Sequence, residues 1–154
     1  MSRVIQVVDS PARAAAVIRM TVPQREMPSV MKPAIDEILA VLKAQGVKPA
    51  GPLFNHYLSM DSGLFDFETG FPIDAPIEPS GRVRPGELPA AKVARTVHFG
   101  PYENLHHAWG VFTALVRSEG LTPAGGLWEC YQEGPESGPD PSNWRTELNL
   151  PIEG

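Results

Sequence analysis

The chain has a single cysteine, Cys130, among 154 residues, so no internal disulfide can stabilise it. Such sparing use of cysteine is typical of a reducing compartment, and we expect a cytoplasmic location. Long apolar runs are absent too. The uncharged stretch 104–116 contains polar residues and is too short to cross a membrane. The N-terminus lacks the apolar core of a signal peptide.

An excess of positive charge is also missing. Thirteen Lys and Arg residues stand against eighteen Asp and Glu residues, which gives a net charge of −5. Phosphate recognition needs a clustered excess of cationic side chains, so we expect no direct binding to DNA. Because 42% of the residues are hydrophobic and only 20% are charged, we expect residues 1–154 to form one folded domain.

Motifs for common enzyme chemistry are mostly absent. The chain has no P-loop, no dinucleotide-binding glycine fingerprint, no G-x-S-x-G and no C-x-x-C. His106 and His107 are adjacent, so on a helix they diverge by about 100° and cannot chelate one ion together. With no H-x-x-x-H spacing either, the sequence predicts no metal site and no cofactor.

The most informative feature is an internal repeat. Residues 46–57, GVKPAGPLFNHY, match residues 120–131, GLTPAGGLWECY, at a constant offset of 74, with six of twelve positions identical. This offset exceeds the period of solenoid repeats, so it indicates two related halves of one domain, at about 1–80 and 88–154.

Each half shows the same order of β-α-β-β elements. The first half has a strand, a helix and two strands at 14–22, 28–45, 53–59 and 64–73, and the second has them at 92–99, 101–119, 127–132 and 143–152. Ser29 is the predicted N-cap of the first helix and Pro101 the first residue of the second, while Gly46 and Gly120 end them.

The two halves predict an α+β fold, an antiparallel sheet with two helices. One helix on a short sheet buries too little surface, so we expect the halves to join about a pseudo-twofold axis around a central ligand cleft. The proline-rich segment 75–89 excludes a helix or a central strand and is the predicted connection. The β-prone residues 4–8 are expected to pair with the first strand of the first half.

Glu129 is the main candidate for chemistry. It lies between apolar and aromatic residues of a predicted strand, and it shares a face with Leu127 and Tyr131. One interpretation is an ordinary solvent-facing glutamate. The other is a carboxylate shielded by aromatic rings, which can hold a cation or move a proton. Asn55 is its counterpart in the first half.

The aromatic residues have the same two interpretations. Tyr57 and Tyr131 are equivalent in the repeat, and they form either a pair at the edge of the core or a platform for a flat ligand. Trp109 lies on the apolar face of the second predicted helix, Tyr102 lies at its start and Trp144 begins the last predicted strand. All of them are candidate ligand-binding residues together with Glu129.

The segment HFGPYENL at 98–105 resembles the signature of the GyrI-like family, which includes the effector-binding domains of AraC- and MerR-type regulators. The segments ECY at 129–131, GP at 134–135, TEL at 146–148 and PI at 151–152 are similar to its C-terminal pattern. The resemblance covers nearly the whole chain. Unlike the regulators, this chain has only thirteen residues before Ala14, so we expect no DNA-binding helices and a stand-alone domain.

The resemblance implies a cleft that takes bulky, aromatic and often cationic molecules, with Glu129 as the acidic residue that contacts them. The leading hypothesis is therefore a small-molecule-binding, multidrug-type protein. The alternative is a hydrolase of cyclopropane-bearing genotoxins, with Glu129 as the general acid or base and Tyr131 orienting it. A third hypothesis is a protein-interaction module whose partner is DNA gyrase or a regulator.

Overall fold

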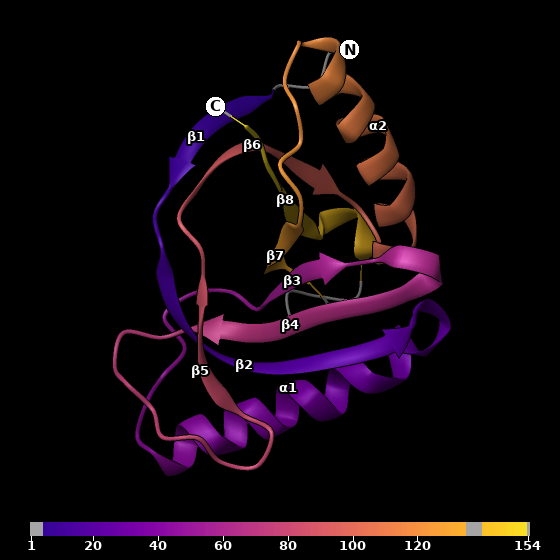
Figure 1. The fold of residues 1–154 in the computed structure, drawn as a ribbon. Helices are drawn as coiled ribbons and strands as arrows, with labels where there is room; N and C mark the ends of the chain where they lie inside the picture. The colour runs from indigo at the N-terminus through magenta and orange to yellow at the C-terminus, as the bar shows by residue number, and fades with distance from the viewer. Residues whose placement is uncertain (1–4, 135–139, 154) are drawn as a thin grey trace. The chain divides into compact units, whose positions relative to one another are not determined.

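A computed structural model describes residues 5–134 and 140–153 of the chain. These residues form two compact units, one within Met1–Pro11 and Ala90–Gly154 and the other within Ala12–Pro89. Each unit combines an antiparallel sheet with one long helix (Figure 1). The predicted α+β class, with antiparallel strands and two helices, is confirmed.

The unit within Ala12–Pro89, called unit two below, holds the first repeat. Its elements are β2 (Arg13–Pro23), α1 (Met27–Ala44), β3 (Phe54–Ser59), β4 (Leu64–Pro72) and β5 (Arg84–Leu88). The strand order is β3-β4-β2-β5. All neighbouring strands of this unit run antiparallel.

The other unit, called unit one, holds the second repeat and the first strand of the chain. Its elements are β1 (Gln6–Ser10), β6 (Ala91–Phe99), α2 (Leu105–Ser118), β7 (Leu127–Glu133) and β8 (Arg145–Pro151). The strand order is β1-β6-β8-β7, and again each pair is antiparallel.

One prediction about strands is wrong, and one strand that was not predicted is present. The N-terminal strand β1 pairs with β6 of the second repeat, through pairs such as Val8 with Val93, and not with the first strand of its own half. The propensity pattern of residues 4–8 identifies a strand but not its partner. The proline-rich connection also contains a strand, β5, which pairs with β2. Pro85 is tolerated there because β5 is the last strand in the order. One side of its backbone has no neighbouring strand, so the missing N–H of proline breaks no bond of the ladder there.

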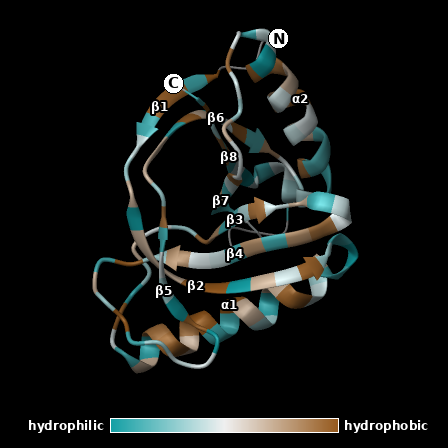
Figure 2. Cartoon of the chain, in the orientation of Figure 1, coloured by the Kyte–Doolittle hydropathy of each residue, from teal (hydrophilic) through white to brown (hydrophobic). Residues whose placement is uncertain are grey.

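The two helices bury equivalent positions of the repeat. The buried residues are Ala34, Ile38 and Leu42 in α1 and Ala108, Phe112 and Val116 in α2. Spacings of four residues place each set on one face of its helix. The two sets differ by the same 74 residues as the sequence repeat. Figure 2 shows apolar and polar residues alternating around α1, as an amphipathic helix requires.

The helix ends are partly as predicted. Gly46 and Gly120 take positive φ angles of 72° and 79° and end their helices. Ser29 is not an N-cap: α1 already begins at Met27, and the Ser29 hydroxyl donates to the carbonyl oxygen of Glu26 at 2.8 Å. The second helix begins later than predicted, because a 3-10 turn, Tyr102–Asn104, separates Pro101 from α2.

The core of unit one lies between α2 and the sheet. Ala108, Phe112 and Val116 of the helix pack with apolar residues of β6, β8 and the segment after β8, namely Ala94, Leu148, Leu150 and Ile152. Trp109, Leu105 and Leu127 lie half-buried at the margin of this cluster. The core therefore holds one face of β7, the face that carries Leu127, against α2.

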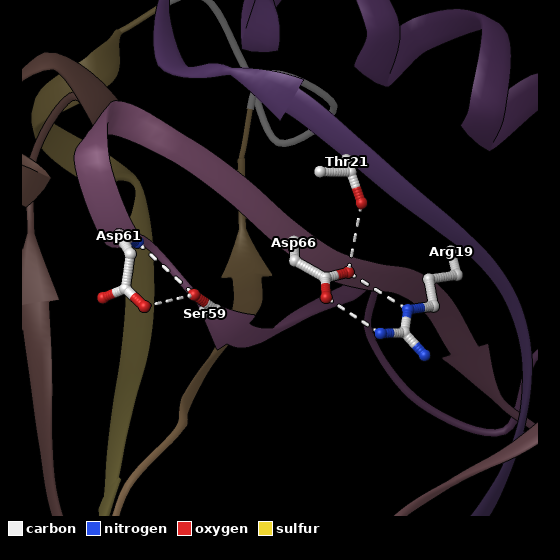
Figure 3. A network of polar contacts seen from close by, with 5 residues as sticks. All are labelled: Arg19, Thr21, Ser59, Asp61 and Asp66. Carbon is white, nitrogen blue, oxygen red and sulfur yellow. Dashed lines mark hydrogen bonds and ion pairs between the residues drawn. The ribbon is translucent and has the colours of Figure 1, made fainter.

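Polar side chains connect the strands of unit two at the surface. Figure 3 shows the Asp66 carboxylate accepting from Arg19 at 2.8 and 3.0 Å and from Thr21 at 3.4 Å, which ties β4 to β2. The Arg19 guanidinium lowers the pKa of Asp66. Because Arg19 is largely exposed, water screens this pair and it contributes little to stability.

None of the helices in the described part of the chain is both long enough and apolar enough to span a membrane.

Candidate ligand-binding site

Glu129 lies on β7 with its side chain toward α2. It is opposite Leu148 of β8, a residue of the core under α2, and only 5% of its surface is exposed. Alternation along the strand places Leu127, Glu129 and Tyr131 on this same face. The choice left open by the sequence is therefore settled: Glu129 is buried and does not face solvent.

Two neutral donors hold the Glu129 carboxylate. The indole N–H of Trp109 donates to Oε2 at 2.7 Å, and the Tyr131 hydroxyl donates to Oε1 at 2.5 Å. None of the ion pairs between described residues includes Glu129. A buried carboxylate is thus hydrogen-bonded at both oxygens but has no cationic partner in the described part of the chain.

Burial controls the acidity of this group. Loss of hydration raises the pKa of Glu129 above its usual value, and the hydrogen bonds from Tyr131 and Trp109 oppose that rise only in part. The carboxyl group therefore gains from either a proton or a cation. Both outcomes are typical of functional carboxyl groups in low-dielectric surroundings.

Aromatic rings extend from the carboxylate. The Tyr131 ring meets the Tyr102 ring edge-on with centroids 5.5 Å apart, and Tyr102 meets Trp144 at 5.0 Å. Tyr102 comes from the turn before α2, and Trp144 directly precedes β8. These rings are half-buried, so each keeps part of its surface accessible. Trp109 continues the series on the helix, with Phe112 at 6.1 Å.

Unit one thus brings five of the six predicted site residues into one chain of contacts, which we call the Glu129 cluster. Its members are Trp109, Glu129, Tyr131, Tyr102 and Trp144. The sixth, Tyr57, lies in unit two, where its ring packs on Phe65 and Phe67 with centroids 5.6 and 5.5 Å away.

A second polar group, which was not predicted from the sequence, lies on the opposite face of the same sheet. Arg95 donates to Asn149 Oδ1 at 2.7 Å and lies 3.5 Å from Glu147, and Asn149 donates to Glu147 at 3.1 Å. A signal for it exists in the last strand, where Glu147 and Asn149 alternate with the buried Leu148 and Leu150. Such alternation marks two sheet faces of different character.

Metal-ligating residues do not gather in the described ranges: no group of three or more His, Cys, Asp or Glu side chains there has an arrangement that could hold an ion. The Glu129 cluster supplies one carboxylate, two neutral donors and several ring faces. That composition suits an organic molecule better than a metal ion.

The chain belongs to the GyrI-like family, because the family model described as the GyrI-like small molecule binding domain matches residues 4–153. The match spans both repeats and includes every member of the Glu129 cluster.

Solved structures share this fold. The C-terminal domain of EcmrR is 21% identical, with a TM-score of 0.87 and 99% of each chain covered. In the EcmrR–DNA complex the match covers 97% of this chain but only 57% of the EcmrR chain, with a TM-score of 0.84 and 21% identity. The domain therefore corresponds to about half of that protein.

Other solved structures are more distant. SAV2435, solved with tetraphenylphosphonium bound, is 12% identical with a TM-score of 0.69, and the match covers 100% of this chain and 95% of that one. A hydrolase from Listeria innocua is 16% identical with a TM-score of 0.71, and 98% and 92% are covered. At these identities the likeness establishes the fold alone. A search of curated proteins finds no match.

Replacing Glu129 by Gln tests the burial of the charge. Folding raises the pKa of Glu129, so between the unfolded and folded pKa values the folded protein binds more protons, and stability falls as pH rises. Gln keeps an oxygen acceptor for Trp109 and carries no charge. Thermal unfolding should give Glu129→Gln a higher melting temperature than the wild type near pH 8, and the gap should close toward pH 4.

The matched control is Glu119→Gln, which alters an exposed glutamate just after α2. Its melting temperature should follow that of the wild type across the same pH range. A gap for Glu129→Gln that does not change with pH would show that the carboxylate is not desolvated.

Proposed function

We propose that this chain binds bulky aromatic cations at the Glu129 cluster. The observation that carries the proposal is the Glu129 carboxylate, buried against α2 and hydrogen-bonded by Trp109 and Tyr131 but without a cationic partner among the described residues. A ligand cation would supply the charge that the chain does not.

Burial makes the interaction strong. Little water is present in such a site to screen charge, so a cation near Glu129 interacts with the carboxylate far more strongly than it would at the surface. The half-buried rings of Tyr102, Tyr131 and Trp144 add contact area and a negative quadrupole face. Each close cation–ring contact is worth about 0.5–2 kcal/mol. Charge and shape together favour a large cation whose charge is spread over aromatic groups.

The neutral donors orient the carboxylate without neutralising it. Trp109 holds Oε2 and Tyr131 holds Oε1, which fixes the plane of the carboxylate relative to α2 and the sheet. Because neither donor is charged, the full negative charge stays available to a ligand once the group is ionised. Preorganisation of this kind raises affinity by reducing the entropy lost on binding.

The comparisons support the same class of ligand. The family model describes a small-molecule-binding domain, and SAV2435, of the same fold, was solved with the aromatic cation tetraphenylphosphonium. The net charge of −5 favours cations over anions and argues against a direct contact with DNA. A protein partner such as gyrase or a regulator stays a prediction.

The decisive experiment compares a cation with a neutral molecule of similar size. Tetraphenylphosphonium should bind the wild type saturably in isothermal titration, and Glu129→Gln should weaken it about 5- to 100-fold, because the variant removes the negative charge that attracts the cation. Triphenylphosphine oxide, which is neutral, should bind both proteins with similar affinity. Binding of the cation should also weaken as pH falls and Glu129 takes up a proton.

Glu119→Gln again serves as the control and should bind like the wild type. Equal losses for the cation and the neutral molecule in Glu129→Gln would contradict an electrostatic role. Absence of saturable binding by the wild type would contradict the proposed ligand class.

A second function is favoured by the surroundings of Glu129 and by a solved structure of the same fold. The pKa of Glu129 is raised and its Oε1 accepts a hydroxyl at 2.5 Å, which are properties of a general acid or base, and a hydrolase has the same fold. In this role Glu129 would activate water for attack on a strained electrophilic ring, and Tyr131 would orient the Glu129 carboxylate. Product formation from a cyclopropane-bearing substrate, lost in Glu129→Gln with binding retained, would establish the hydrolase. Binding without product would refute it.

A further inference from the structure

A groove lies at the C-terminal end of α1, within unit two. Its volume is about 340 Å³, near the lower end of the range of about 300–1,000 Å³ that is usual for small-molecule sites. The described residues that line it are mostly apolar, and none of them is acidic. We call it the α1 groove, and its lining includes Leu39, Leu42, Val47, Pro49, Lys43 and Lys48.

Hydrogen bonds hold the main chain around the α1 groove. The N–H of Val47 donates to the Leu42 carbonyl oxygen at 2.9 Å. The N–H of Gly46 donates to the Lys43 carbonyl oxygen at 3.2 Å, and the two bonds together form a Schellman motif. Pro49 forms a bridge to the segment directly after β4. The walls of the groove are therefore preformed, so a ligand loses little affinity to their ordering.

Unit one has the same frame with a different lining. The equivalent two bonds end α2, at 3.2 and 3.0 Å, and they lie 74 residues further along the chain. Thr113 and Thr122 stand there in the places of Leu39 and Lys48. Unit two therefore carries an apolar side chain and a cation at two positions where the shared frame needs neither.

The α1 groove combines accessible apolar surface with positive charge. Leu39 is 39% exposed although its side chain is large and apolar. Lys43 and Lys48 are exposed, and neither takes part in the ion pairs between described residues. Lys43 lies in the last turn of α1, where a cation stabilises the helix, but Lys48 lies beyond the helix. The helix therefore explains one of the two lysines and not the other.

We propose that the α1 groove binds an amphiphilic anion, namely a carboxylate with an unbranched apolar tail. The tail would cover Leu39, Val47 and Pro49, and the carboxylate would accept hydrogen bonds from the ammonium groups of Lys43 and Lys48. Burial of the tail and charge-assisted hydrogen bonds at the head both favour this class of ligand. The site lies wholly within unit two, and it does not depend on the proposed function.

Three probes separate the contribution of the tail from that of the charge. Octanoate is the main probe, octanol is its neutral counterpart and decanoate is its longer homologue, each used below the concentration at which it aggregates. In protein labelled with 13C at Leu and Val methyl groups, octanoate should shift the signals of Leu39 and Val47 saturably. Decanoate should bind more tightly, by about fourfold for each further methylene that the groove buries.

Two variants place the residues of the second repeat in the groove. Lys48→Thr should weaken octanoate about 2- to 5-fold, the scale of an exposed ion pair, and should leave octanol unchanged. Leu39→Thr should weaken octanoate and octanol by similar factors, because it removes apolar contact from both. The matched control is Lys92→Thr, which alters an exposed lysine of β6 in unit one and should bind octanoate like the wild type. Circular dichroism and thermal unfolding check that each variant folds.

The outcomes judge this proposal separately from the role of Glu129. Octanoate that leaves the Leu39 and Val47 signals unshifted overturns it. Equal losses of octanoate and octanol in Lys48→Thr, or a loss in Lys92→Thr as large as that in Lys48→Thr, also overturn it. Glu129→Gln should leave the octanoate titration of Leu39 unchanged, whereas tetraphenylphosphonium binding by the same variant tests the proposed function.

Discussion

A carboxylate removed from water needs donors, a proton or a cation, and this requirement organises unit one around Glu129. Trp109 and Tyr131 supply the donors, and the apolar cluster beneath α2 holds the helix and β7 in the positions that these bonds need. No cation of the described chain completes the arrangement. The buried carboxylate lowers the stability of the fold relative to a well-packed apolar residue at this position. Under the proposed function, a cationic ligand would recover part of this cost, and stability and binding would be opposed at one side chain.

Duplication explains why the scaffold tolerates such a residue. The helices of both repeats bury equivalent positions, and both tyrosines bond to the residue two places earlier. The repeat therefore provides the same frame twice, while substitutions at two positions, Glu129 for Asn55 and Trp109 for Ile35, change its chemistry. One copy holds a carboxylate with a donor at each oxygen, and the other holds a neutral amide whose oxygen has no donor among the described residues.

The sequence predicts much of this, because periodicity and repetition are local signals. The buried stripes of α1 and α2, the glycines that end them and the order of elements within each half all follow from spacing.

The pairing of strands cannot be predicted in this way. The pairing of β1 with β6, and the presence of the strand β5 in a proline-rich segment, depend on contacts between residues far apart in the chain. At the site, alternation along β7 identifies the face of Glu129, but the Trp109–Glu129 bond depends on how α2 lies on the sheet. Asn55 is recognisable as a counterpart from the repeat, whereas the lack of a partner for its oxygen within residues 5–134 and 140–153 is a property of the packed structure.

The account depends on Glu129 being a desolvated acid whose negative charge a bound cation stabilises. Titration of the Glu129 carboxyl carbon by NMR, using protein labelled with 13C at glutamate and assigned with Glu129→Gln, tests this directly. We predict that the free protein shows a Glu129 pKa above the ordinary value and that saturating tetraphenylphosphonium lowers it, because the cation favours the ionised form. An ordinary pKa in the free protein, or a raised pKa that the cation leaves unchanged, would contradict the account.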